Sequence, residues 1–494
     1  MGRCLNIAYG FYKPESNEVA GVSDQNKGHS ILPLAVDVDG SLLKTDLLLE
    51  SFWAALGRQP VACLLVVFRY MLNRPMLKKQ LAALARLDVS LLPLQEDVVA
   101  VMRAAKGEVV LASGSDSRLV GELSVRLNLK SKPMASDGRI NLTGDRKAAA
   151  LAARFGAGEY CYIGNSSADI PAWAASAGGY VVGAQAGFAR KVAALGPDIR
   201  PLGAPVKLRA LLRALRPHQW VKNILLLLPL LAAHRADAAG LLLAGIGMVL
   251  FSLAASSIYI VNDLMDLEAD RKHETKCKRP FASGEASLLA GMGVSAGLGL
   301  VALVGALLLS WQMAAIIALY MVLSLSYSMG LKRLRWVDIA MLAALYTLRV
   351  VAGSVAVGVA MSGWLGAFIF PIFLALGGVK RLIELGKAKG EAALPGRGYA
   401  RRDRADLRNI AITASVGAMV VYTLYTYSDI AATLYQNLWM IRLAALPVAL
   451  WLTRMIMLGW KGKMDYDPIV FALRDPIGLA LVGTGAFMLV QAAG

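Results

Sequence analysis

The second half of the chain contains about nine apolar stretches of the kind that cross a lipid bilayer. They are residues 221–234, 238–261, 287–309, 312–330, 338–359, 363–379, 410–427, 438–458 and 477–493. An apolar helix of roughly 20 residues spans the hydrocarbon core, where every backbone polar group needs an internal partner. With 57% hydrophobic residues among 494, the chain is too apolar for an ordinary soluble enzyme. The sequence therefore predicts an all-α membrane domain.

Basic residues gather in every second loop between these stretches. The loops after the second, fourth, sixth and eighth stretches are rich in Lys and Arg, and the alternate loops are nearly free of them. Because basic loops stay in the cytosol, we expect an inner (plasma) membrane protein with its N-terminal domain and active sites on the cytosolic side. Topology and phosphate binding then explain the net charge of +18, and we expect no nucleic-acid partner.

The first half has the alternating pattern of a soluble α/β domain. Helical stretches alternate with strand-like runs, which is typical of a parallel, Rossmann-like sheet, and the runs are residues 31–36, 108–112, 160–163 and 180–182. A helical insertion at about 47–105 separates the first two runs. Its apolar part, Val61–Val67, is far too short to span a membrane and predicts a cap subdomain or a surface at the membrane interface.

These patterns divide the chain into four parts. Residues 1–30 are polar and predict a disordered tail. Residues 31–200 form the α/β domain, residues 201–210 form a linker near a segment rich in proline and glycine, and residues 211–494 form the membrane domain.

A run rich in carboxylates follows the second apolar stretch directly. Its oxygen-bearing side chains have a spacing typical of one helical face, and they are Asn262, Asp263, Asp266 and Asp270. At the end of a membrane span such a group is costly unless it holds a cation, and Mg²⁺ prefers oxygen ligands. Side chains suited to phosphate oxygens come next, namely Arg271, Lys276 and Arg279. Carboxylates beside cations predict a site for a magnesium-bound diphosphate, whereas a loop that only anchors the topology would explain the cations alone.

Together these residues form an NDxxDxxxD motif followed by RxHxxKxxRP. The combination resembles the first aspartate-rich motif of the UbiA prenyltransferase superfamily, whose members perform transfer chemistry on prenyl substrates in the membrane. The resemblance implies a UbiA-like domain with Asp263 and Asp266 as catalytic residues. It also implies that Asp263, Asp266 and Asp270 bind Mg²⁺, and that Asn262 lies at a metal and diphosphate position.

The region after the sixth apolar stretch indicates which branch of the superfamily the chain resembles. Aromatic prenyltransferases of the superfamily carry a second DxxxD motif there, whereas this chain reads Lys380-Arg381-Leu382-Ile383-Glu384. With residues 216–223, 327–332 and 467–472, the chain resembles instead the polyprenyl-phosphate phosphoribosyltransferases, the branch of decaprenylphosphoryl-5-phosphoribose synthase. That branch implies transfer of 5-phosphoribose from phosphoribosyl pyrophosphate to a polyprenyl phosphate in the bilayer, with Mg²⁺ assisting the departure of pyrophosphate.

Further side chains at the ends of the apolar stretches are candidates for binding phosphate oxygens, and they are Lys222, Tyr327, Lys332, Lys380 and Arg381. A site rich in Lys and Arg with one carboxylate cluster suits several phosphate groups better than it suits a neutral aromatic acceptor. Each of these residues could equally anchor a helix end at the membrane surface.

Polar side chains also follow the predicted strands of the α/β domain. They are Asp37, Asp39, Ser113, Lys147, Asn165 and Asp169. Their order and spacing resemble the haloacid dehalogenase superfamily. The resemblance implies a phosphatase with Asp37 as nucleophile, Asp39 as general acid/base, and Ser113 and Lys147 as phosphate-binding residues.

The same resemblance implies a second Mg²⁺ site, formed by Asp37, the carbonyl group of Asp39, Asn165 and Asp169. Asn165 stands where the superfamily usually has an aspartate. An amide oxygen can bind magnesium without contributing a formal charge, so we expect weaker metal binding.

The two halves suggest a two-step pathway at the membrane. The membrane domain would make polyprenylphosphoryl 5-phosphoribose, and the α/β domain would remove the 5-phosphate to give a lipid-linked sugar for the cell wall or another surface glycan. Two alternatives stay open. One is an aromatic, quinone-type prenyltransferase that uses a prenyl diphosphate, and the other is a membrane protein whose N-terminal domain is not catalytic.

Overall fold

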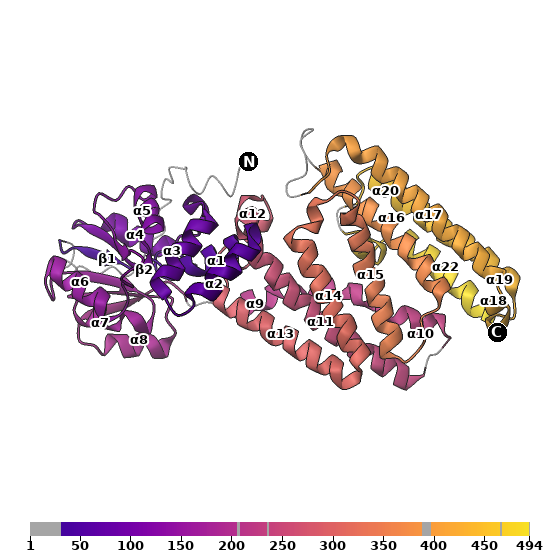
Figure 1. The fold of residues 1–494 in the computed structure, drawn as a ribbon, viewed down its shortest axis with the longest axis horizontal. Helices are drawn as coiled ribbons and strands as arrows, with labels where there is room; N and C mark the ends of the chain where they lie inside the picture. Colours follow the sequence, from indigo (N-terminus) through magenta and orange to yellow (C-terminus); the bar gives the residue numbers. More distant parts are fainter. Residues whose placement is uncertain (1–30, 205–207, 235–236, 388–396, 465–466, 494) are drawn as a thin grey trace. The chain divides into compact units, whose positions relative to one another are not determined.

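The computed structural model describes residues 31–204, 208–234, 237–387, 397–464 and 467–493. The predicted disordered tail and residues 205–207 of the predicted linker lie outside the described residues. The chain forms two compact units, which we describe separately (Figure 1). The first unit comprises residues up to 215 together with 259–295, and the second comprises 216–258 together with 296–494.

A six-stranded parallel sheet forms the centre of the α/β domain. Its order is β3-β2-β1-β4-β5-β6, and the strands are β1 (Leu34–Val36), β2 (Val109–Asp116), β3 (Met134–Ser136), β4 (Cys161–Gly164), β5 (Gly178–Val182) and β6 (Asp198–Leu202). The chain leaves β1 toward β2 on one side and returns to β4 on the other. The carboxyl ends of β1, β2 and β4 therefore meet at the point where ligands bind in such sheets.

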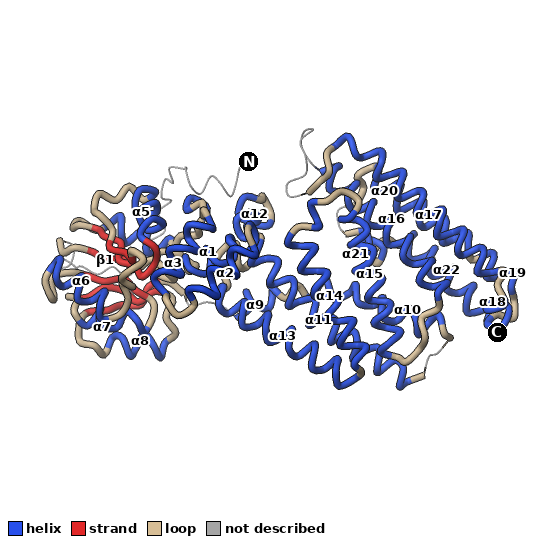
Figure 2. The backbone as a smooth tube through the Cα atoms, viewed as in Figure 1, coloured by secondary structure: helices blue, strands red, loops and turns tan. Residues whose placement is uncertain are grey.

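The two faces of the sheet are buried by different helices, as Figure 2 shows. Leu34 and Val36 belong to one apolar cluster and Ala35 to another, because successive side chains of a strand point to opposite faces. The helices of the domain are α1 (Leu47–Arg58), α2 (Pro60–Tyr70), α3 (Arg74–Ala85), the 3-10 turn η1 (Val89–Leu91), α4 (Glu96–Ala104), α5 (Ser117–Arg126), α6 (Asp145–Phe155), η2 (Ser167–Asp169), α7 (Ile170–Ala174), α8 (Ala186–Ala193) and α9 (Leu208–Ala214).

The four predicted strand-like runs are strands, and the sheet contains two more, β3 and β6. The α/β domain extends beyond its predicted end at residue 200, because strand β6 pairs with β5 through Leu202. The proline and glycine near it mark the end of an edge strand, where a missing N–H is tolerated.

The helical insertion at 47–105 is confirmed, but it has two parts. Helices α1, α2 and α3 share their own small core, which includes Ala55, Cys63 and Leu81. Helix α4 packs instead on the sheet through Val98 and Val99. The cap therefore consists of α1–α3 alone.

The division of the chain into compact units differs from the predicted domain boundaries. Residues 259–295 were predicted in the membrane domain, but they belong to the same compact unit as the α/β domain. This segment contains the end of α11 (Ala238–Met265), then α12 (Leu267–Lys272), η4 (Lys276–Lys278) and the start of α13 (Leu288–Leu309). Phe281 is fully buried and lies over Gly291, where a Cβ atom would be 2.5 Å from the ring.

Helices dominate the second unit. Besides α11 and α13, they are η3 (Pro217–Leu227), α10 (Leu228–Ala232), α14 (Trp311–Met329), η5 (Leu331–Arg333), α15 (Val337–Ala356), α16 (Gly363–Lys387), η6 (Arg401–Asp403), α17 (Arg404–Thr426), α18 (Asp429–Leu434), α19 (Leu438–Leu443), α20 (Ala445–Trp460), α21 (Pro468–Ala472) and α22 (Pro476–Ala493). An apolar core that includes Tyr346, Phe373, Ala411 and Met455 joins α15, α16, α17 and α20.

The prediction of nine spans is corrected to eight within the described residues, counting helices that are long and apolar enough to cross a membrane. The exception is the first predicted stretch, 221–234, which forms the 3-10 helix η3 and the five-residue helix α10. Pro229 lies in the first turn of α10, where its lack of an N–H group favours a new helix over continuation of the old one.

Segment η3 lies directly against α15. A Cβ atom on Gly353 would stand 2.1 Å from the carbonyl oxygen of Leu226, so only glycine permits this approach. The contact brings Lys222 and Asn223 of η3 into the interior of the second unit, where both are buried.

Candidate functional sites

Asp37, Lys147 and Asp169 meet at the carboxyl ends of β1 and β4. The Nζ atom of Lys147 donates to Asp37 Oδ1 at 2.7 Å, to Asp169 Oδ1 at 3.0 Å and to the hydroxyl group of Tyr162 at 2.9 Å. All three charged side chains are buried. The structure thus brings together residues separated by more than a hundred positions, as the motif order predicted.

Asp39 and Ser113 lie beside this group. Asp39 accepts hydrogen bonds from the backbone N–H of Leu47 at 2.8 Å and from the hydroxyl group of Ser115. Ser113 is fully buried, and its hydroxyl oxygen accepts from the backbone N–H of Ser115 at 3.0 Å. The carboxylate of Asp39 is therefore tied to the first turn of α1, at the base of the cap.

The site has three carboxylates and one ammonium group in a buried space, and its pKa values reflect this. Burial raises the pKa of Asp37 to about 7, against the opposing effect of Lys147. Burial likewise raises the pKa of Asp39 to about 6. Burial also tends to raise the pKa of Asp169, but Lys147 and the hydrogen bonds lower it below the usual range. Two excess negative charges at one site suit a divalent cation.

The oxygen donors of this site are of the kind that magnesium prefers. Asn165 lies over the turn after β1, where a Cβ atom on Gly40 would be 2.1 Å from Asn165 Nδ2. Asp169 uses one oxygen for Lys147 and Tyr162 and the other for the backbone N–H groups of Asn165 and Ser166. Asp37 also accepts hydrogen bonds through both oxygens, from Lys147 and from the hydroxyl group of Ser41 at 3.1 Å. The metal-binding roles of Asp37, Asn165 and Asp169 therefore stay predictions.

The acidic segment places Asp263 and Asp270 around one guanidinium group. Nη1 of Arg279 donates to Asp263 Oδ1 at 3.0 Å and to Asp270 Oδ2 at 2.7 Å, and both carboxylates are buried. Burial raises the pKa of Asp270, while Arg279 opposes that rise. The helical face predicted from the spacing is interrupted at Asp266, which caps α12 after α11 has ended.

This group also fits Mg²⁺ on the evidence of its oxygen atoms. Two carboxylates already converge on one positive charge, that of Arg279. The Oδ1 atom of Asn262 is buried and has no hydrogen-bond partner in the part of the chain that the structure describes. Among those residues no three His, Cys, Asp or Glu side chains come together as a ready metal site.

Arg271 has a structural partner that the sequence did not reveal. Its Nη1 and Nη2 atoms donate to both carboxylate oxygens of Glu50, at 3.0 and 2.5 Å, and its Nε atom donates to the carbonyl oxygen of Ala282 at 3.0 Å. Glu50 lies in α1, 221 residues earlier, and also accepts from Thr45 at 2.7 Å. Arg58 of α1 similarly binds Glu268 of α12. Arg271 therefore joins the acidic segment to the cap. Its binding of phosphate oxygens stays a prediction. Lys276 is exposed in η4.

In the second unit, two predicted phosphate-binding lysines share one carboxylate. Asp467 Oδ2 accepts from Lys222 Nζ at 2.9 Å and from Lys380 Nζ at 2.8 Å. The ring of Tyr346 lies 5.8 Å from Lys222 Nζ. Burial favours protonation of Asp467, but Lys380 and Lys222 lower its pKa well below the usual range. The cluster has one excess positive charge, which suits an anion such as a phosphate group.

Arg381 and Tyr327 belong to a different, charge-balanced network. Arg381 is fully buried and donates to Asp338, to Glu384 and to the hydroxyl oxygen of Tyr327. Arg397 donates to Asp338 and Tyr327 as well. Two guanidinium groups thus face two carboxylates at the position of the missing second aspartate motif. Arg381 and Tyr327 are thus engaged by protein partners, and their binding of phosphate oxygens stays a prediction. Lys332 lies half-buried in η5.

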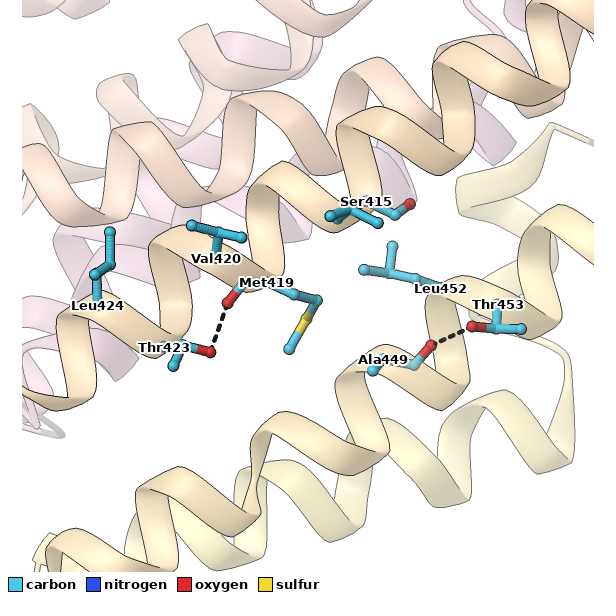
Figure 3. Close-up of a pocket in the computed structure, with 9 residues that line it drawn as sticks. Ser415, Met419, Val420, Thr423, Leu424, Ala449, Leu452 and Thr453 are labelled. Atoms are coloured by element: carbon cyan, nitrogen blue, oxygen red, sulfur yellow. Dashed lines mark hydrogen bonds between the residues drawn. The ribbon is translucent and has the colours of Figure 1, made fainter.

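A groove between α17 and α20 contains none of the predicted site residues (Figure 3). It has a volume of about 400 Å³ and is lined mainly by apolar side chains, including Met419 and Leu452. The hydroxyl groups of Thr423 and Thr453 donate to carbonyl oxygens of their own helices. The groove therefore offers no charge for a phosphate.

Comparison with known proteins supports the prediction that the second half of the chain is a UbiA-like membrane domain. The model of the UbiA prenyltransferase family matches residues 224–474, about half of the chain. The "Uncharacterized protein y4nM" of Sinorhizobium fredii (strain NBRC 101917 / NGR234) is 34% identical over 460 residues, which cover 90% of this chain and 88% of that protein. The decaprenyl-phosphate phosphoribosyltransferase of Mycobacterium tuberculosis (strain ATCC 25618 / H37Rv) is 31% identical over 275 residues, 54% of this chain and 88% of that protein.

Among solved structures, a UbiA homolog from Archaeoglobus fulgidus bound to GPP and Mg²⁺ is similar with a TM-score of 0.43. It is 14% identical and covers 57% of this chain and 99% of that chain. The apolar helices and the sequence matches define an integral membrane transferase. The chain belongs to the UbiA prenyltransferase family.

The pair of Glu50 and Arg271 generates a prediction about the acidic segment. Glu50→Ala leaves the guanidinium group of Arg271, whose side chain is 7% exposed, without its carboxylate. Loss of one partner of a buried ion pair costs about 3–5 kcal/mol. We expect faster amide hydrogen exchange in α12 and in the first turn of α1, which contains Glu50, measured by mass spectrometry on the purified protein.

A matched control is Glu285→Ala, which removes the half-exposed partner of Arg213 in the same unit and should cost at most about 1 kcal/mol. Equal exchange in α12 for both variants would show that Glu50 does not hold this segment.

Proposed function

We propose that the membrane domain transfers 5-phosphoribose from phosphoribosyl pyrophosphate to a polyprenyl phosphate. The observation that carries the proposal is the pairing of Lys222 and Lys380 on one carboxylate, Asp467. An aromatic prenyltransferase needs a second carboxylate pair for its diphosphate, but at that position this chain has a charge-balanced network in which Arg381 and Arg397 face Asp338 and Glu384. The name of the mycobacterial relative, decaprenyl-phosphate phosphoribosyltransferase, supports the same substrates.

Within this proposal, the acidic segment binds the diphosphate of phosphoribosyl pyrophosphate. Asn262, Asp263 and Asp270 would hold Mg²⁺, which when bound neutralises the charge that develops on the departing pyrophosphate. Arg279 is 27% exposed at its side chain, so its guanidinium group can reach phosphate oxygens as well as the two carboxylates. Asp266 is a candidate for contact through water, since it lies half-buried at the start of α12.

The cluster of Lys222 and Lys380 would bind a phosphate group of a substrate. In the reaction, an oxygen of the lipid phosphate forms a bond to C1 of ribose while the bond from C1 to the pyrophosphate oxygen breaks. The attacking oxygen is already anionic, so no side chain needs to remove a proton. The chain's contribution is therefore orientation and charge stabilisation. The basic loops support an orientation with these groups on the cytosolic side of the plasma membrane.

The α/β domain would remove the 5-phosphate of the product. Asp37 would attack phosphorus, Asp39 would protonate the leaving oxygen, and Lys147 would orient Asp37 and bind phosphate oxygens. The pKa of Asp39, raised to about 6 by burial, suits a group that gives and takes a proton near neutral pH. Asp37 and Asn165 would hold the Mg²⁺ of this site, and the bound metal would offset repulsion between nucleophile and phosphate.

The transferase is tested with the purified full chain in detergent, given MgCl₂, a polyprenyl phosphate and phosphoribosyl pyrophosphate labelled in the ribose. We expect label in the lipid phase. Asp263→Asn should reduce labelling by about 10²-fold or more, because it removes a metal-binding charge. The exposed Asp406→Asn serves as control and should retain activity. Absence of ribose label, with transfer from a prenyl diphosphate to an aromatic acid by the same preparation, would contradict the proposal.

The phosphatase is tested on the same lipid product by mass spectrometry. Wild type should yield the lipid-linked ribose, whereas Asp37→Asn should accumulate its 5-phosphate, with hydrolysis lowered by about 10³-fold or more. The control is Asp137→Asn, an exposed turn residue of the same domain, which should behave as wild type. Hydrolysis at the wild-type rate in Asp37→Asn, or 5-phosphate retained by every variant, would show that this domain does not act on the product.

A further inference from the structure

Helix α2 of the cap exposes an unusually apolar face. The side chains of Val61, Leu64, Leu65 and Phe68, with Leu72 just after the helix, are between 57% and 95% exposed. They recur at positions that share one side of a helix. Single exposed apolar residues are common on soluble proteins, but a contiguous group of five marks a surface that contacts something else.

The opposite face of α2 is already used. Cys63 is fully buried, and Val66 and Val67 pack with Ala55 and Leu81 in the small core of the cap. The helix is therefore apolar on both sides. Turning α2 around would bury the exposed face only by exposing an equally apolar one, so its exposure does not reflect a poorly packed cap.

The segment that carries this face is basic. Residues 51–86 contain six Lys or Arg side chains and no Asp or Glu. Arg69 at the end of α2 and Arg74 at the start of α3 are both exposed. An apolar helical face with exposed cations at its end is complementary to a surface that is apolar inside and anionic outside.

The end of α1, which directly precedes α2, contacts the end of α11 and helix α12. A Cβ atom on Gly57 would be 3.4 Å from the carbonyl oxygen of Met265, and Met265 is the last residue of the membrane-spanning helix α11. Arg58 binds Glu268 of α12. Helix α2 starts at Pro60, two residues later. All these residues belong to the first unit, so α2 begins next to the point where the chain leaves the membrane.

We propose that α2 is an in-plane membrane anchor. Its face of Val61, Leu64, Leu65, Phe68 and Leu72 lies in the boundary between head groups and acyl chains, and Arg69 and Arg74 contact the phosphates of anionic phospholipids. The occupant of this surface is thus the bilayer that holds the spanning helices. The anchor does not depend on which substrates the two active sites use.

The test places a photo-crosslinking residue on this face in the full chain. Phe68 is replaced by p-benzoylphenylalanine, which preserves a large aromatic side chain, and the protein is reconstituted in nanodiscs of phosphatidylcholine and phosphatidylglycerol. The matched control replaces Val125 of α5, which is 75% exposed in the same unit. After irradiation, mass spectrometry of the digested protein identifies what each position has captured.

We expect phospholipid adducts at position 68 at a yield at least about tenfold above that at position 125. Equal yields at the two positions would overturn the proposal. Adducts at position 68 with a second copy of the chain, or with another segment of the same chain, would assign the face to that partner instead and overturn it as well. Leu65, on the same face, provides a second labelling position if the Phe68 variant fails to fold.

Discussion

The need to neutralise buried carboxylates at the end of α11 governs the arrangement of the first unit. Asp263 and Asp270 are both buried, and one guanidinium group, that of Arg279, is shared between them. Buried charges without compensation are far too costly to keep. The segment that follows is in turn fixed to the cap by Glu50 and Arg271. The acidic motif therefore has its geometry set partly by residues of the N-terminal half.

The second unit contains two groups of buried charges that differ in how the charges are compensated. Around Arg381 the charges balance, with Asp338 and Glu384 facing Arg381 and Arg397, and the network holds helix ends together. Around Asp467 they do not balance, because two lysines share one carboxylate. A preformed group with an excess positive charge is ready to bind an anion without rearrangement. The two groups therefore differ in net charge, although all their cations are Lys or Arg near helix ends.

Local patterns in the sequence predicted much of this structure, since hydrophobic period and turn residues act over a few positions. The strands that end at Asp37 and Asn165, the helical insertion, and most of the spanning helices were predicted in this way. Segment 217–232 was not, because its apolar composition hides a 3-10 helix broken at Pro229. The predicted boundary at residue 200 fell inside strand β6, because Pro201 and the glycine after the strand are typical of a linker but are also tolerated at the end of an edge strand.

The remaining differences between the predicted sites and the structure involve pairs of residues that lie far apart in the sequence. Glu50 and Arg271 are 221 residues apart, and Lys222 and Asp467 are 245 apart, so no local pattern links either pair. Arg271, Arg381 and Lys380 all had the same predicted role, and only their partners in the structure distinguish them. The motif of the α/β domain was more informative, because the order of a parallel sheet brings the ends of β1 and β4 together.

The most direct test of the account is calorimetric binding of phosphoribosyl pyrophosphate to the full chain in detergent, with and without Mg²⁺. The account predicts binding that requires Mg²⁺ and is weakened about tenfold or more by Asp263→Asn, while Asp406→Asn, a change at an exposed residue of α17, has no effect. Binding that is independent of Mg²⁺ and indifferent to Asp263, or binding of a prenyl diphosphate in place of phosphoribosyl pyrophosphate, would contradict the central claim.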